Sequence, residues 1–276
     1  MKPVSTRQVF VALLRDFGID AVCDVGSMNG EDALAFRVRL PRARILALEP
    51  NPTNLRAMRQ DARLAAANIE VLGVAASDVN ARAPFFLVDA EYHENARRGM
   101  SSLHRRDPRA YPTTAVDVET TRLDTLLAPM GNGARLALWI DVEGHACEVL
   151  EGLRAIAPQV AMLHVEVESQ PCVAAGQRLY PEARALLESW NFREIATDHP
   201  HTNPQFNALF VRHPLEPHLQ RRVASRLFQA RVRRSLVDAS RSLCPACLRR
   251  LSALRGRLVA YRQRKFARHS ASGAAT

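Results

Sequence analysis

The first 213 residues of the chain alternate short apolar runs with longer helix-like segments. The apolar runs end at glycine or acidic residues, as buried strands do, and the segments between them are rich in helix formers such as Leu, Ala and Arg. Strands that are separated by helices indicate βαβ units and a mainly parallel sheet. The sequence therefore predicts an α/β fold, whose ligands bind beyond the carboxyl ends of the strands.

The residue ranges of the expected elements follow from this alternation. Strands are expected at 21–25, 45–48, 69–75, 136–141, 160–167, 192–196 and 208–211. Helices are expected at 6–17, 31–39, 53–67, 146–156 and 181–190. An irregular insertion, with one further strand at 84–88, extends to residue 112.

The positive charge of the chain is concentrated at its C-terminal end. From Pro214 onward there are 15 Lys and Arg against two acidic residues, so this segment carries +13 and the first 213 residues carry −3 of the net +10. The shift predicts a boundary between a domain at 1–213 and a basic extension at 214–276. Within the extension, residues 218–268 intersperse Arg with Leu, Val and Phe, which indicates two basic helices separated near Cys244 and Pro245.

Several partners fit this basic extension. An anionic membrane surface, a nucleic-acid backbone, an acidic protein, and packing against the domain or a second protomer all agree with its charge and apolar spacing. Aromatic residues are sparse in it, so stacking on single-stranded bases is not indicated and nucleic acid is the less favoured partner.

The composition argues against several classes of protein. With 47% apolar residues the chain is not disordered throughout, and no apolar stretch reaches the roughly 18–20 residues of a transmembrane helix. The N-terminus shows no secretory signal, so we expect a cytoplasmic protein, with the extension as a means of peripheral attachment to the inner membrane surface. Cys244 and Cys247 form a C-P-A-C word without further ligands nearby, so no metal site is predicted.

Polar residues follow the first two expected strands. The segment from Asp24 to Gly30, D-V-G-S-M-N-G, connects a strand to a helix through two glycines, which let the backbone turn tightly and approach a ligand. Its spacing is not G-x-G-x-x-G, so the pyrophosphate-binding fingerprint of dinucleotide enzymes is absent. Glu49 ends the next strand, where an acid accepts hydrogen bonds from both ribose hydroxyls of an adenine nucleoside.

A third group of polar residues closes the expected strand at 136–141. The segment W-I-D-V-E-G-H contains Asp141 and Glu143, which lie on the same side of an extended chain, followed by His145. Acids are also favoured at the N-terminus of a helix without any ligand. Two carboxylates and a glycine at the end of a buried strand nevertheless favour a ligand site.

Taken in order, these words resemble the FkbM family of S-adenosylmethionine-dependent O-methyltransferases. The matching words run from Cys23 to Val211: DVGSMNG, ALEPNPTNL, AASD, SSL, TTRLDTLL, WIDVEGHACEVLEGL and LHVEVE. The resemblance implies a Rossmann-like class I methyltransferase fold with a mostly parallel seven-stranded sheet. It also implies S-adenosyl-L-methionine as the cofactor.

The residues that the resemblance implies in cofactor binding are Asp24, Gly26, Gly30, Glu49, Ser77, Asp78 and Asp141. The loop residues would line the methionine and ribose part of the cofactor, and Glu49 would hold the ribose diol. Ser77 and Asp78 would lie near the adenine. Asp141 would lie beside the reactive methyl group.

Methyl transfer to an alcohol also requires that the alcohol lose a proton, which a general base accepts. His145 is the first candidate for this base because the unperturbed pKa of histidine is about 6.5. Asp141 is the second candidate. The resemblance places Glu143 close by and Glu166 at the far wall of the pocket. The packing or capping of a helix is the alternative role of His145, and His164, inside a strand pattern, is expected in the core.

Two residues depart from the family pattern. Met28 stands where the family commonly has Asn, and Ala146 stands where it usually has a second Glu after the D-V-E-G word. The predicted function is nevertheless O-methylation of a hydroxyl on a sugar, glycolipid or secondary metabolite, so the acceptor is a small molecule or a glycan. Two interpretations fit the insertion at 89–112, which is rich in Arg: a lid or acceptor site for an anionic or glycosylated acceptor, and a solvated loop. The alternatives are a nucleic-acid or protein methyltransferase anchored by the extension, and a degenerate cofactor-binding subunit without activity.

Overall fold

The computed structural model describes residues 3–88, 99–131 and 133–242. The chain divides into two compact units, residues 1–230 and 231–276. The first unit contains two sheets and the helices that cover them. The boundary between domain and extension at residue 214 stays a prediction.

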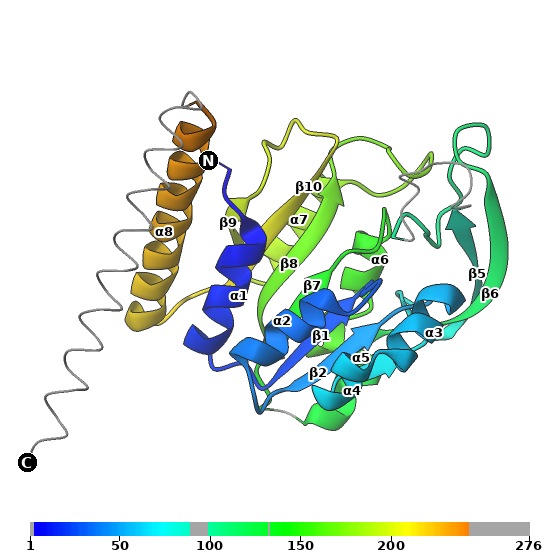
Figure 1. The fold of residues 1–276 in the computed structure, drawn as a ribbon, viewed down its shortest axis with the longest axis horizontal. Helices are drawn as coiled ribbons and strands as arrows, with labels where there is room; N and C mark the ends of the chain where they lie inside the picture. Colours follow the sequence, from blue (N-terminus) through cyan, green and yellow to red (C-terminus); the bar gives the residue numbers. More distant parts are fainter. Residues whose placement is uncertain (1–2, 89–98, 132, 243–276) are drawn as a thin grey trace, which may run out of the picture. The chain divides into compact units, whose positions relative to one another are not determined.

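The main sheet has seven strands in the order β3-β2-β1-β7-β8-β10-β9 (Figure 1). The strands span Glu70–Leu72 (β3), Arg44–Leu48 (β2), Ala21–Val25 (β1), Leu136–Ile140 (β7), Val160–Glu168 (β8), Gln205–Arg212 (β10) and Phe192–Thr197 (β9). Strand β10 is antiparallel to both of its neighbours, and the remaining pairs are parallel. The expected mostly parallel seven-stranded sheet is therefore confirmed. Its order reverses between β1 and β7, which is where sheets of this kind bind ligands.

Helices cover both faces of the main sheet. One face carries α1 (Thr6–Asp16), α2 (Glu31–Arg39), α3 (Pro52–Gln60), α4 (Ala62–Ala66) and the start of α8 (Pro217–Ser242). The other carries α5 (Leu123–Leu127), α6 (Ala146–Glu151), α7 (Tyr180–Ser189) and the 3-10 helices η1 (Ala128–Met130) and η2 (Arg154–Gln159). Because side chains alternate along a strand, β1 contributes Val22 to the first core and Cys23 and Val25 to the second.

Aromatic side chains fill the core beneath α1. The rings of Trp139 and His164 stack with their centroids 3.5 Å apart, and the edge of Phe10 packs against both. Thr6 Oγ1 lies 2.9 Å from His164 Nε2. His164 is thus the core histidine that was predicted, and burial lowers its pKa to about 3.

A small second sheet lies beyond the β3 edge of the main sheet (Figure 1). It consists of β4 (Ala75–Ala76), β6 (Thr113–Thr121) and β5 (Ala81–Val88), in the order β4-β6-β5. The strand expected at 84–88 is the second half of β5. Strand β6 was not expected, although its sequence T-T-A-V-D-V-E-T-T alternates β-branched residues with acids, which is a strand signal.

Two expected elements are each divided in the structure. The strand expected at 69–75 is wrong as a single element, because the chain leaves the main sheet at Gly73 and enters the small sheet at Ala75. A Cβ on Gly73 would lie 2.5 Å from Leu55 Cδ2, so a side chain there would require Leu55 to shift. The helix expected at 53–67 breaks at Asp61, whose carboxylate accepts a hydrogen bond from Arg63 N at 2.8 Å and caps α4.

The basic extension begins as helix α8. The part of α8 that belongs to the first unit ends at Ala230. It buries Leu219, Val223 and Ala230 in the same core as α1, and Arg226 Nε donates to Asp16 Oδ2 at 2.9 Å. The second basic helix expected after Cys244 lies outside the described residues, as does the C-P-A-C word. Among the described residues, no helix combines the length and the apolar character that crossing a bilayer requires.

Candidate active site

The glycine loop from Gly26 to Gly30 connects β1 to α2 at the point where the sheet order reverses. Gly26 has φ +84, and a Cβ on it would lie 1.8 Å from the backbone oxygen of Asp141. Gly30 has φ +78 at the start of α2, and a Cβ on it would lie 2.6 Å from Leu64 Cδ2. Both positions therefore require glycine, the first for the approach of β7 and the second for the packing of α4.

Two buried acidic residues, Asp24 and Glu49, accept hydrogen bonds from this loop. Asp24 is buried at the end of β1, where its Oδ2 accepts a hydrogen bond from Ser27 Oγ at 2.6 Å, and burial raises its pKa to about 8. Glu49 is buried at the end of β2 and accepts hydrogen bonds from Met28 N at 2.7 Å and from Asn51 N at 2.8 Å. Burial raises the pKa of Glu49 to about 7, against the lowering effect of these hydrogen bonds.

The D-V-E-G turn follows β7 directly opposite the glycine loop. Asp141 N donates to the carbonyl oxygen of Val25 at 2.9 Å, which joins the two loops. Glu143 adopts φ +49, a left-handed conformation that is uncommon for residues other than glycine. Ser102 Oγ donates to the backbone oxygen of Glu143 at 2.7 Å and so connects the S-S-L word to this turn.

Three carboxylates gather beyond the turn. Asp141, Glu143 and Glu166 each bring an oxygen to within 4.8 Å of the others. Burial raises the pKa of all three, and the negative charges of Asp141 and Glu143 raise that of Glu166 further. Gln205 Nε2 donates to Glu166 Oε2 at 2.8 Å.

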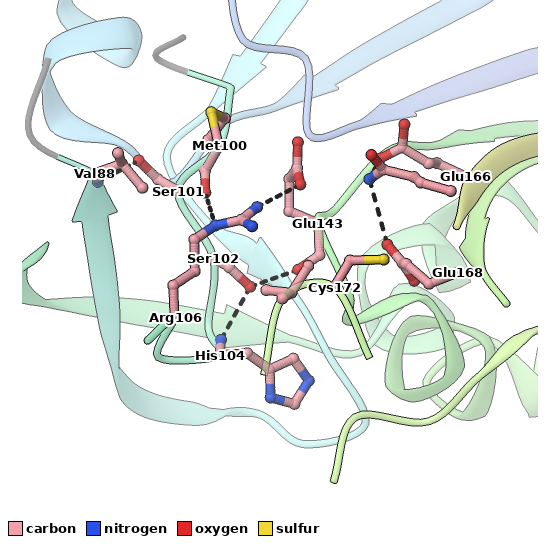
Figure 2. A network of polar contacts seen from close by, with 12 residues as sticks. Val88, Met100, Ser101, Ser102, His104, Arg106, Glu143, Glu166, Glu168 and Cys172 are labelled. Atoms are coloured by element: carbon pink, nitrogen blue, oxygen red, sulfur yellow. Dashed lines mark hydrogen bonds and ion pairs between the residues drawn. The ribbon is translucent and has the colours of Figure 1, made fainter. Parts of the chain in front are cut away.

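A buried arginine neutralises part of this acidic charge. Arg106, whose side chain is 6% exposed, donates from Nη2 to Glu143 Oε2 at 2.6 Å and from Nε to the carbonyl oxygen of Met100 at 3.0 Å (Figure 2). Its guanidinium also lies over the ring of Tyr111, 5.5 Å from the centroid. These contacts attach the segment after the S-S-L word to the D-V-E-G turn.

Two hollows adjoin at these loops. The narrower hollow is lined by Val25, Gly26, Met28, Glu49, Pro50, Val74, Ala75, Ala76, Phe85, Gly99, Ser101, Leu103, Asp141, Val142 and His145. The wider and more polar hollow is lined by Gly26, Met28, Gly99, Met100, Arg106, Tyr111, Asp141, Glu143, Glu166, Cys172, Val173 and Gln205. The residues common to both are Gly26, Met28, Gly99 and Asp141.

A family model described as the methyltransferase FkbM domain matches residues 24–194, more than half of the chain and the whole of the site's framework from the glycine loop to β8. The chain belongs to the FkbM methyltransferase family. The predicted methyltransferase activity, its dependence on S-adenosyl-L-methionine and the class I fold are thereby confirmed.

Individual relatives of this FkbM methyltransferase are distant. The 2-O-methyltransferase NoeI of Sinorhizobium fredii (strain NBRC 101917 / NGR234) is 24% identical over 179 residues, which are 61% of this chain and 72% of NoeI. Among solved structures, the precorrin-6y C5,15-methyltransferase from Geobacter metallireducens GS-15 is 12% identical with a TM-score of 0.42, over 75% of this chain and 87% of that one. The N-terminal domain of EvdMO1, in the presence of SAH and D-fucose, is 15% identical with a TM-score of 0.42, over 76% and 83%.

Some of the predicted site residues line one of the two hollows, and others line neither. Gly26, Glu49, Asp141 and His145 line the narrower cavity, while Glu143 and Glu166 line the wider hollow. The predicted residues that line neither hollow are Asp24, Gly30, Ser77 and Asp78.

Ser77 faces away from the cavity toward His145. Its Oγ lies 3.0 Å from His145 Nε2 and donates to Asp78 Oδ1 at 3.1 Å. The backbone of Ser77 packs against Gly152, where a Cβ would lie 2.0 Å from the Ser77 oxygen. The glycine that ends the V-L-x-G word therefore allows the A-A-S-D segment to lie against α6.

Sequence reasoning missed two residues of the wider hollow. Gln205 lies at the start of β10, and Tyr111 lies just before β6. Gln205 could have been found as a polar residue at the start of an expected strand. Only the antiparallel direction of β10, however, places the start of this strand at the edge of the sheet where the carboxyl ends of the parallel strands lie. His199 and His201 lie on the exposed β9–β10 loop and line neither hollow.

Proposed function

We propose that this enzyme transfers the methyl group of S-adenosyl-L-methionine to a hydroxyl of a sugar or a similarly polyhydroxylated acceptor. The observation that carries the proposal is the wall of Gly26, Met28, Gly99 and Asp141 that the two hollows share. A cofactor in the narrower cavity and an acceptor in the wider hollow would meet at this wall. Because methyl transfer is an in-line displacement at the sulfonium, such positioning supplies most of the catalysis.

In this proposal the narrower cavity holds the nucleoside. Glu49 accepts a hydrogen bond from the ribose diol, since its two backbone donors and the Asn54 side chain leave one of the roughly four lone-pair positions of the carboxylate open. Val74, Ala76 and Phe85 supply an apolar surface for the adenine. Gly26 lets the backbone approach the methionine part of the cofactor. Asp24 does not line the cavity but holds Ser27, and with it the loop, in place through a hydrogen bond.

The wider hollow is suited to an acceptor with many hydroxyl groups. Its wall offers carboxylates at Glu143 and Glu166, the amide of Gln205 and the ring of Tyr111. Hydroxyls both donate to carboxylates and accept from amides, so each of these side chains has a partner on a sugar. The relative NoeI is a 2-O-methyltransferase, which supports transfer to oxygen.

Asp141 is the general base in this proposal. It lies on the shared wall, burial raises its pKa, and its hydrogen bond with Glu166 leaves lone pairs of the same carboxylate for an acceptor hydroxyl. Both ring nitrogens of His145 already have partners, Ser77 at 3.0 Å and His104 at 3.3 Å. We therefore place Asp141 ahead of His145 as the base.

Calorimetric titration of the cofactor tests the first half of the proposal. Wild-type enzyme should bind S-adenosyl-L-methionine, and Glu49→Ala should weaken binding by about tenfold or more, because a charge-assisted hydrogen bond contributes about 1.5–3 kcal/mol. Glu70→Ala is the control, since Glu70 is a half-exposed acid on the neighbouring strand that pairs with Arg44. Equal affinities of wild type and Glu49→Ala would contradict the assignment of the cavity.

The acceptor class is tested by formation of S-adenosyl-L-homocysteine with panels of saccharides, peptides and RNA. We expect turnover with a saccharide, and Gln205→Ala should raise the KM for that acceptor while the cofactor Kd stays unchanged. Turnover with RNA or peptide alone would overturn the proposed acceptor but not the cofactor site.

A further inference from the structure

Beside the narrower cavity, three side chains that take no part in the proposed transfer face one another. His104 follows the S-S-L word, and His145 and Glu148 lie at the N-terminal end of α6. Each brings one ligand atom to within 4.8 Å of the other two. Two imidazoles and a carboxylate are a donor set that binds divalent transition metals such as Zn²⁺.

Hydrogen bonds orient His145 toward the other two side chains. Ser77 Oγ has a single proton, which it donates to Asp78, so its contact with His145 Nε2 requires the imidazole to donate. His145 Nδ1 therefore carries a lone pair. That nitrogen lies 3.3 Å from His104 Nε2 and 3.7 Å from Glu148 Oε2.

This arrangement has the form of a metal-binding histidine with its supporting partner. Histidines that bind a metal through one nitrogen commonly donate from the other to an oxygen that fixes the ring, and the chain from Asp78 through Ser77 provides one here. Two ligand atoms bound at ~2.0–2.1 Å in tetrahedral geometry lie about 3.3–3.4 Å apart. The 3.3 Å between the two imidazole nitrogens matches this spacing.

The carboxylate provides an independent observation. Glu148 Oε2 is buried and accepts no hydrogen bond from any residue that the structure describes. Buried polar atoms without a partner are uncommon in folded proteins and call for a ligand or water. This oxygen faces the lone pair of His145 rather than a donor.

We propose that His104, His145 and Glu148 bind a divalent transition-metal ion in a three-ligand site with an open fourth position. His104 belongs to the segment whose Ser101 and Leu103 line the narrower cavity, whereas His145 is fixed on α6. A bound ion connects α6 to the segment that contains Ser101, Leu103 and His104, and holds this segment over the cofactor. The site thus acts on cofactor retention and not on the methyl transfer itself.

Metal titration of the full chain tests the proposal. The protein is stripped with a chelator in a Cys244→Ser, Cys247→Ser background, which removes the thiol pair as a competing ligand, and is titrated with Zn²⁺ by calorimetry and with Co²⁺ by visible absorption. We expect one ion per chain and a tetrahedral Co²⁺ spectrum. His104→Ala and Glu148→Gln should each weaken binding by about tenfold or more, while His199→Ala, which alters an exposed histidine paired with Asp198, should bind as the parent does.

The outcomes separate this site from the proposed function. His104→Ala removes a side chain from a connecting segment, and its fold is checked by circular dichroism and by cofactor binding of the metal-free protein, which should equal that of the metal-free parent. Metal binding that is equally strong in His104→Ala and in its parent would overturn the site. Metal binding that is weakened as much by His199→Ala as by His104→Ala would overturn it as well. Loss of metal binding with cofactor binding retained in the same variant would support it whatever the acceptor proves to be.

Discussion

The backbone oxygen of Asp141 occupies the space that a side chain on Gly26 would need, 1.8 Å from the position of its Cβ. This contact joins the glycine loop after β1 to the D-V-E-G turn after β7 and brings cofactor loop and proposed base together. The requirement for glycine at this position is therefore one of space as well as of φ.

Gly26→Ala should destabilise the enzyme by about 2–4 kcal/mol and abolish cofactor binding, because both the left-handed backbone and the contact with Asp141 are disturbed. Gly18→Ala is the matched control, since Gly18 has φ +59 but nothing within 4 Å of a Cβ. We expect it to cost only about 1 kcal/mol, from the backbone conformation alone. Urea unfolding of both variants provides the comparison, and equal losses would contradict the role of the contact.

Met28 adopts φ 55 in the same loop, where the family commonly has Asn. Asn tolerates the left-handed region better than a long apolar side chain does. Met28→Asn should therefore raise the free energy of unfolding by about 0.5–1 kcal/mol. Met28→Leu serves as the control because it keeps the strain. A thermal unfolding midpoint that does not rise in Met28→Asn would show that the apolar contact of Met28 with Gly99 outweighs the strain.

Arg106 and Glu143 form a buried ion pair, which distinguishes it from surface ion pairs with the same distance between nitrogen and oxygen. Arg106→Ala leaves the Glu143 carboxylate buried beside Asp141 and Glu166, so we expect a loss of about 3 kcal/mol of stability and weaker acceptor binding. The pair between Arg82 and Asp117 has the same 2.6 Å separation but is exposed, and Arg82→Ala should change stability little. Urea unfolding that ranks the two variants in the opposite order would contradict this account.

The buried Asp24 makes the stability of the cofactor-free enzyme depend on pH. Its pKa in the folded protein is about 8, whereas an unfolded aspartate titrates near 3.8, so the folded state holds the extra proton between these values. This contribution to stability is present below the unfolded pKa and decreases as the pH rises through about 8.

Between pH 6 and 8.5 the wild-type enzyme should therefore lose more stability than Asp24→Asn, which cannot ionise. Urea unfolding at several pH values measures the difference. His164, whose pKa is depressed to about 3, lowers stability as the pH falls below the unfolded value of about 6.5, but both proteins contain it, so its effect cancels in the comparison. Parallel pH profiles for the two proteins would show that Asp24 does not titrate in this range.

Much of the fold was predictable because its signals are local. Most strands of the main sheet are short apolar runs, and the glycine loop, Glu49 and the D-V-E-G turn lie at the carboxyl ends of three strands that are neighbours in the sheet, β1, β2 and β7. Local signals failed where neighbouring interactions compete. Asp61 caps a new helix within an otherwise continuous helical pattern, and Gly73 divides a strand pattern between two sheets.

The sequence by itself determined the α/β class, the family and the loops that we propose to surround the cofactor, since these follow from apolar periodicity and from motifs of a few residues. Only the tertiary structure decided which distant side chains meet: Arg106 with Glu143, Gln205 with Glu166, and His104 with His145. Each of these contacts joins residues about 40 positions apart in the sequence, in different loops or strands. Such contacts depend on the strand order and on the path of the connecting segments, which are set by the packing of the whole domain and not by any local pattern.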